Sequence, residues 1–216
     1  MRPRASLAIL LALICFMGCS KGVDRAKGVY VLLDTSGTYA EELKKAQAII
    51  NYLLGTLQPG DTLAVGRIDT GSFSEKDIIA KVRFDQRPSV ANTQKRSFQM
   101  KIDAFVSTAA DSSFSDISGG VLQAIEYLNE SAAGRKYILI FSDLQEELAK
   151  GYVRDVPFQL DGFNVIALNV TKLRNDNRDP KNYMDRVEAW RGKTEKGGGQ
   201  WRVVNDLERL DTIFNQ

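Results

Sequence analysis

The chain has 216 residues, of which 44% are hydrophobic and 26% are charged, a composition typical of a globular protein with one main domain. It contains 29 basic residues, 27 acidic residues and no histidine, which excludes Ser-His-Asp and Cys-His catalytic sites. This balance of charge also argues against nucleic-acid binding and against a polybasic membrane patch.

The first 18 residues have the features of a secretory signal. Two arginines precede an uncharged apolar run, LAILLALICFMG, which is too short to span a bilayer as a helix. The run closes with FMGC, ending at Cys19, and resembles the lipobox of bacterial lipoproteins, in which the cysteine is acylated and becomes the first residue. We therefore expect a signal peptide over 1–18 and a lipidated tether over 19–27. A plain signal peptide is the alternative.

Cysteine usage favours the lipid anchor. Cys15 would leave with the signal, so Cys19 would be the single thiol of the mature chain, and a lone free thiol is unusual in an oxidising compartment. Without Arg2 and Arg4, 27 basic residues face 27 acidic ones, so membrane contact would come from the lipid. In lipoproteins, a serine such as Ser20 is compatible with sorting to the outer membrane. We expect a lipid-anchored protein of the bacterial cell envelope, on the outer membrane facing the periplasm if the host has two membranes.

The rest of the chain alternates between strand-like and helix-like segments. Continuous apolar runs predict buried strands, and apolar residues at a spacing of three to four predict helices. Strands are expected at 28–33, 62–69, 77–84, 136–142, 164–170 and 200–204. Helices are expected at 39–57, 94–106, 117–128 and 179–193, with a last helix from about Asn205.

The order of these segments predicts the architecture. The runs 62–69 and 77–84 are separated by a short turn, so they should pair as a hairpin and place one antiparallel strand at an edge. The remaining alternation predicts an α/β three-layer sandwich over 28–216, with a mostly parallel central sheet. The serine-rich stretch 107–115 is expected to be a loop, and the three glycines 197–199 a turn.

Polar side chains stand where the predicted strands end. Asp34, Ser36 and Thr38 follow the first strand, Ser115 precedes a helix, and Asp143 follows KYILIFS. Ligands of open α/β sheets lie beyond the carboxyl ends of the strands, so we expect one shared crevice. Oxygen donors without histidine or cysteine suit a hard divalent ion, Mg²⁺ or Mn²⁺, rather than zinc, copper or iron.

The string DTSGT after a buried strand resembles the metal-ion-dependent adhesion site (MIDAS) of von Willebrand factor A (vWA) domains, whose motif is Asp-x-Ser-x-Ser with a distant Thr and a later Asp. The resemblance covers about 27–216 and implies the vWA fold. It implies that the hydroxyls of Ser36, Thr38 and Ser115 bind the ion, while Asp34 and Asp143 act mainly through water. It also implies a binding module rather than an enzyme, whose protein partner supplies a carboxylate to the ion.

The sequence departs from this pattern at three positions. Thr38 replaces the second serine and Ser115 replaces the threonine, which keeps a hydroxyl at both places. Leu144 follows Asp143 where the family usually has glycine. Ser115 is assigned because the glycine and aliphatic residues of ISGGVL follow it, and Ser113 is a competing candidate in the same loop.

Two other interpretations are open. Asp34 and Ser36 could simply cap the following helix, which would make the chain a vWA-type scaffold with a vestigial metal site. A phosphatase of the haloacid dehalogenase type has the motif Asp-x-Asp-x-Thr, but here Ser36 stands in place of the second aspartate. That interpretation also lacks an acidic pair after a later strand.

Overall fold

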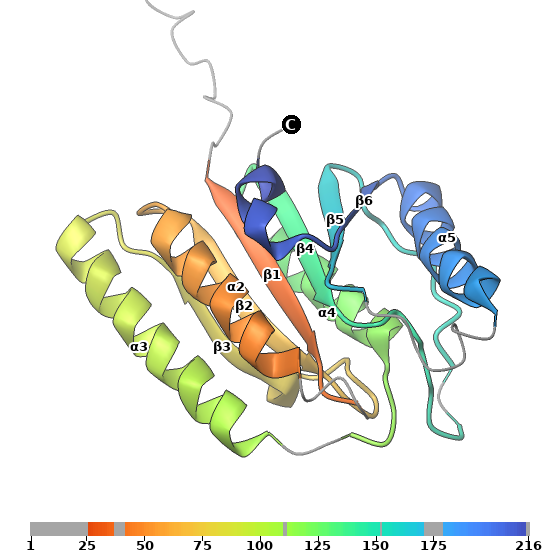
Figure 1. The fold of residues 1–216 in the computed structure, drawn as a ribbon. Helices are drawn as coiled ribbons and strands as arrows, with labels where there is room; N and C mark the ends of the chain where they lie inside the picture. The colour runs from red at the N-terminus through yellow and green to blue at the C-terminus, as the bar shows by residue number, and fades with distance from the viewer. Residues whose placement is uncertain (1–25, 37–41, 110–111, 152, 171–178, 215–216) are drawn as a thin grey trace, which may run out of the picture.

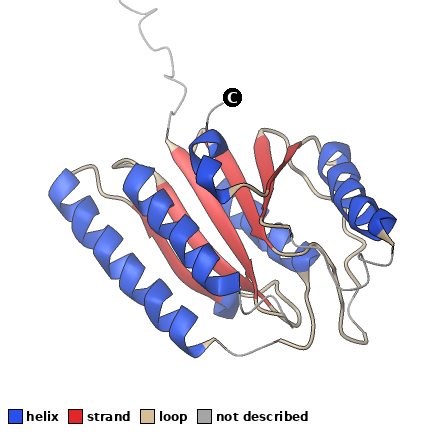
Figure 2. Cartoon of the chain, viewed as in Figure 1, coloured by secondary structure: helices blue, strands red, loops and turns tan. Residues whose placement is uncertain are grey.

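The computed structural model describes residues 26–36, 42–109, 112–151, 153–170 and 179–214. In this part the chain forms one six-stranded sheet with helices on both faces (Figure 1 and Figure 2). The predicted signal, Cys19 and Thr38 lie outside the described residues. No helix in the described ranges is both long enough and apolar enough to cross a membrane.

The sheet confirms the predicted α/β architecture. Its strands are β1 (Lys27–Asp34), β2 (Thr62–Ile68), β3 (Ile78–Arg83), β4 (Arg135–Phe141), β5 (Phe163–Leu168) and β6 (Gln200–Val204). They lie in the order β3-β2-β1-β4-β5-β6. All neighbours pair in parallel except β2 and β3, which form the expected antiparallel hairpin at an edge. The hairpin connection contains a short 3-10 helix, η3 (Glu75–Asp77).

Two layers of helices cover the sheet (Figure 1). The helices are α2 (Leu43–Thr56), α3 (Pro88–Thr108), α4 (Ile117–Glu130) and α5 (Pro180–Lys196), followed by a 3-10 helix, η5 (Leu207–Ile213). α2, α3 and η5 pack on one face, and α4 and α5 on the other. Alternate side chains of a strand point to opposite faces. Accordingly, Val31 of β1 joins the first core and Leu32 the second.

Two predicted boundaries and one predicted helix type were wrong. α3 begins at Pro88 rather than Gln94, because proline is tolerated in the first turn of a helix and the apolar pattern is weak there. β5 ends at Leu168, since Asn169 has φ 52° and leaves the extended conformation. The C-terminal element is a 3-10 helix, and the Asn205 side chain accepts a hydrogen bond from the Val170 amide at 2.8 Å.

α4 lies unusually close to β1. A Cβ atom added at Gly120 would lie 2.9 Å from Cδ2 of Leu32, nearer than side chains normally approach. The absence of a side chain at Gly120 therefore allows the first turn of α4 to pack directly against β1. Because Ser115 precedes α4 by two residues, this contact carries it toward the carboxyl end of β1.

Candidate metal centre

The candidate site lies at the carboxyl end of the sheet, where the strand order reverses. β1 has β2 on one side and β4 on the other, which is the position at which open α/β sheets bind ligands. Asp34 is the last residue of β1, and Asp143 follows the end of β4 by two residues. The topology therefore delivers both carboxylates to the same edge.

The carboxylate of Asp34 is the centre of a hydrogen-bond network. Its Oδ1 accepts from the Ser36 amide at 2.9 Å and from Ser36 Oγ at 2.6 Å. Its Oδ2 accepts from Ser115 Oγ at 3.1 Å and from Ser142 Oγ at 2.6 Å. The Asp34 side chain is fully buried, so this network is shielded from water. Three segments far apart in sequence thus converge on one side chain.

This network orients the hydroxyl groups of Ser36 and Ser115. Ser36 and Ser115 direct their protons toward Asp34, which leaves the lone pairs of their oxygens available to a further group. Both oxygens of Asp34 are already engaged by donors, so its charge would act on an ion through these hydroxyls or through water. The donor set fits a hard divalent ion. In the described ranges, no three Asp, Glu, His or Cys side chains gather around an ion position, so the site depends on its hydroxyls.

Burial disfavours the ionised forms of both carboxyl groups of the site. It raises the pKa of Asp34 above the ordinary aspartate value, although the serine hydrogen bonds oppose this shift. Burial also raises the pKa of Asp143 to about 6, with a smaller contribution from the neighbouring charge of Asp34 and an opposing one from Arg186. Little solvent is available to stabilise the ionised forms of Asp34 and Asp143, so a bound cation would stabilise both ionised forms.

The conformation of the serine-rich loop shows which of Ser113 and Ser115 lies beside Asp34. Ser115 is buried and contacts Asp34, whereas Ser113 is exposed and forms no part of this network. Ser115 also exchanges two backbone hydrogen bonds with Glu147, at 2.8 and 3.0 Å. The neighbouring Ser112 donates to Asp69 Oδ1 at 2.6 Å, which fixes the loop on its other side.

Two contacts of the site were missed from the sequence. Ser142, the last residue of KYILIFS, binds Asp34, and its place beside Asp143 was the available signal. Asp116 is buried, accepts from the Gly119 amide at 2.8 Å, and pairs with Arg154 Nη2 at 2.7 Å. This pair links the loop before α4 to the segment after β4, and no local pattern indicates it.

Comparison with known proteins identifies the fold. No protein-family model and no curated protein matches the chain. Among solved structures, a von Willebrand factor type A protein from Catenulispora acidiphila has a TM-score of 0.54 and 12% identity over 87% of this chain and 40% of its own. The pilus adhesin SpaC from Lactobacillus rhamnosus GG has a TM-score of 0.57 and 12% identity over 89% and 29%, respectively. The chain has the vWA fold.

The vWA likeness is one of fold. Another similar structure is a mutant of the PilB minor pilin from Streptococcus sanguinis, with a TM-score of 0.50 and 13% identity over 90% of this chain and 60% of that one. This chain therefore spans less than two thirds of the length of each of these proteins. Function has to be argued from the residues of the site, because one fold hosts many functions.

The leucine that replaces the usual vWA glycine adopts a glycine-like conformation. Leu144 has φ 65°, in the left-handed region that disfavours side chains. Its amide donates to Ser142 Oγ at 3.0 Å, and its carbonyl accepts from Trp190 Nε1 at 3.1 Å. The side chain is buried in the core beneath α4 and α5. Packing thus holds a strained backbone beside Asp143.

The positive φ of Leu144 predicts that a glycine variant at this position will be more stable than an alanine variant. Leu144→Ala should lower the free energy of unfolding by about 2–5 kcal/mol, because a buried side chain is removed. Leu144→Gly should be about 1 kcal/mol more stable than Leu144→Ala, since glycine adopts φ 65° without strain. Urea denaturation of the three proteins measures both differences. An alanine variant more stable than the glycine variant would show that the backbone is not strained here.

Proposed function

We propose that this chain is a membrane-anchored, vWA-like lipoprotein that binds a protein partner through a metal-bridged carboxylate, and that it is not an enzyme. Mg²⁺ or Mn²⁺ would be held by the hydroxyls of Ser36, Thr38 and Ser115. Asp34 and Asp143 would balance its charge. The ion would supply a Lewis-acidic position that attracts a carboxylate of the partner.

The single observation that carries this proposal is the convergence on Asp34. Ser36 and Ser115 are 79 residues apart in the sequence, yet their hydroxyls donate to different oxygens of the same buried carboxylate. A helix cap would need only the first of these contacts. The second requires the loop before α4, and it places two neutral oxygen donors around one shielded negative charge.

Titration calorimetry with Mg²⁺ tests the proposal. Because the partner would complete the coordination shell, the titration is run with and without acetate as a surrogate carboxylate. We expect binding heat that increases in acetate. If neither condition gives heat or thermal stabilisation, the alternative of a vestigial site on a vWA scaffold takes its place.

The position of β1 bears on how a lipid-anchored chain would present its site. β1 begins at Lys27, the last residue of the expected tether, and ends at Asp34 in the site. A strand of this length spans about 23 Å, so Lys27 and the site lie at opposite ends of the sheet. A protein held by Cys19 would therefore present the site away from its own membrane, toward a partner in the periplasm.

Mass spectrometry of the mature protein tests the anchor. We expect an N-terminal Cys19 carrying acyl chains, and a mass consistent with the loss of residues 1–18. A Cys19→Ser variant should appear in the soluble fraction instead of the membrane fraction. An unmodified Cys19 in mature wild-type protein would contradict lipidation.

A further inference from the structure

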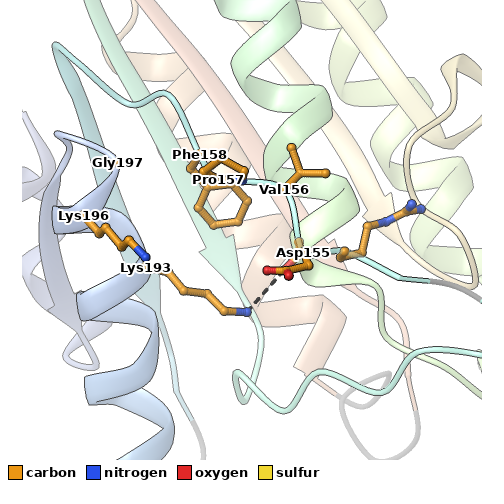
Figure 3. Close-up of a pocket in the computed structure, with 9 residues that line it drawn as sticks. Asp155, Val156, Pro157, Phe158, Lys193, Lys196 and Gly197 are labelled. Carbon is orange, nitrogen blue, oxygen red and sulfur yellow. Dashed lines mark hydrogen bonds between the residues drawn. The ribbon is translucent and has the colours of Figure 1, made fainter.

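A second concave site lies between α4, α5 and the segment 154–158. Its volume is about 370 Å³, at the small end of the roughly 300–1,000 Å³ typical of ligand sites. Figure 3 shows Val156, Pro157 and Phe158 on one side of this cavity, with Lys193 and Lys196 reaching from α5 on another. The cavity thus has an apolar wall and a cationic wall.

The apolar wall is held in place by the end of α5. Phe158 is buried and stacks on Trp190, with ring centroids 6.3 Å apart and an interplanar angle of 16°. A Cβ atom at Gly197 would lie 2.7 Å from the carbonyl oxygen of Phe158, so glycine permits the close contact. Val156, in contrast, is 53% exposed and offers apolar surface to a ligand.

The two lysines of the cationic wall differ in the contacts that they already make. Lys193 Nζ lies 3.1 Å from Glu146 Oε2 and 3.4 Å from Ser118 Oγ, at the edge of the cavity. Lys196 is exposed and forms no ion pair with another described residue. One carboxylate, that of Asp155, also lines the cavity. An anion can therefore gain chiefly from Lys196, and Lys193 can contribute in competition with Glu146, while the carboxylate of Asp155 opposes binding.

We propose that this cavity binds the C-terminal residue of a partner polypeptide whose last side chain is apolar. Such a residue carries a carboxylate and an apolar group on the same carbon atom, which matches two dissimilar walls around one small cavity. The carboxylate meets Lys196 and Lys193, and the side chain meets Val156, Pro157 and Phe158. The proposal does not depend on a metal at Asp34.

NMR titration of the purified protein with N-acetyl-Ala-Leu tests this site. The matched control is the same peptide as its C-terminal amide, which keeps the apolar group and removes the charge. We expect the free acid to shift the amide signals of Val156, Phe158 and Gly197 and the indole signal of Trp190. The amide should bind about tenfold more weakly, as loss of a charge-assisted contact predicts. Equal binding of acid and amide, or no shifts at about 10 mM peptide, would overturn the assignment.

Three charge variants locate the contact. Lys196→Gln should weaken binding of the free acid about five- to tenfold and leave the amide unchanged. Asp155→Asn should strengthen binding of the acid, because it removes the opposing carboxylate. Lys181→Gln, on the first turn of the same helix, makes the same charge change outside the cavity and should have no effect. An equal effect of the two lysine variants would assign the binding to general charge and overturn the proposed site.

Discussion

Under the metal-site proposal, replacing Asp34 with asparagine should abolish the stabilisation of the protein by Mg²⁺. In wild type, an ion at about 100 times its dissociation constant should add about 2.7 kcal/mol to the free energy of unfolding. The variant keeps the shape of the side chain but loses the buried charge to which Ser36 and Ser115 donate. Thermal denaturation with Mg²⁺, with and without acetate, measures the increment in each protein.

The comparison is made within each variant, because asparagine also disturbs the serine hydrogen bonds. The control is Asp103→Asn, which makes the same chemical change at an exposed position of α3. It should retain the whole Mg²⁺ increment. An increment that survives in Asp34→Asn would place the ion elsewhere, and one lost in both variants would indicate a general charge effect.

Asp143→Asn should stabilise the protein when no metal is present. The pKa of Asp143 is raised from 3.8 to about 6, chiefly by burial, so its ionised form is disfavoured in the folded state. This raises the free energy of the folded protein by about 3 kcal/mol at pH 8, where the carboxyl is ionised in both states. Asparagine removes this cost and keeps an oxygen to accept from the Gln145 amide.

The sign of the pH dependence follows from the direction of the shift. At pH 4 the folded protein holds Asp143 protonated, so the cost is largely absent; it grows as the pH rises from about 4 to about 6 and is constant above this range. The gain from Asp143→Asn should therefore fall from about 3 kcal/mol at pH 8 to about 0.5 kcal/mol at pH 4. Denaturation in the presence of a chelator measures it. A gain that is the same at both pH values would refute ionisation of Asp143 as the cause.

Mg²⁺ should reduce the stability advantage of Asp143→Asn over wild type. A bound cation favours the ionised form of Asp143, so wild type gains stability while the asparagine variant gains less. At saturating Mg²⁺ and pH 8 the advantage of the variant should shrink or disappear. A constant advantage at all Mg²⁺ concentrations would separate Asp143 from the metal proposal.

Much of the fold could be predicted from local patterns. The run GVYVLL predicts a strand covered on both faces, and the spacing of apolar residues in 43–57 predicts α2. Boundaries were less accurate where the pattern is weak. The start of α3 was missed because few of its first residues are buried, and η5 is 3-10 rather than α.

The sequence by itself determined the layered α/β fold and the chemical character of the candidate site. Alternating apolar runs specify strands and helices, and Asp34, Ser36 and Thr38 stand at alternate positions within five residues of the chain, so both can be read locally. Only the tertiary structure decided that Ser115 rather than Ser113 reaches Asp34, that Ser142 joins them, and that Arg154 pairs with Asp116. These contacts join residues 38 to 108 positions apart, and their geometry depends on strand order and on the close approach of α4 to β1.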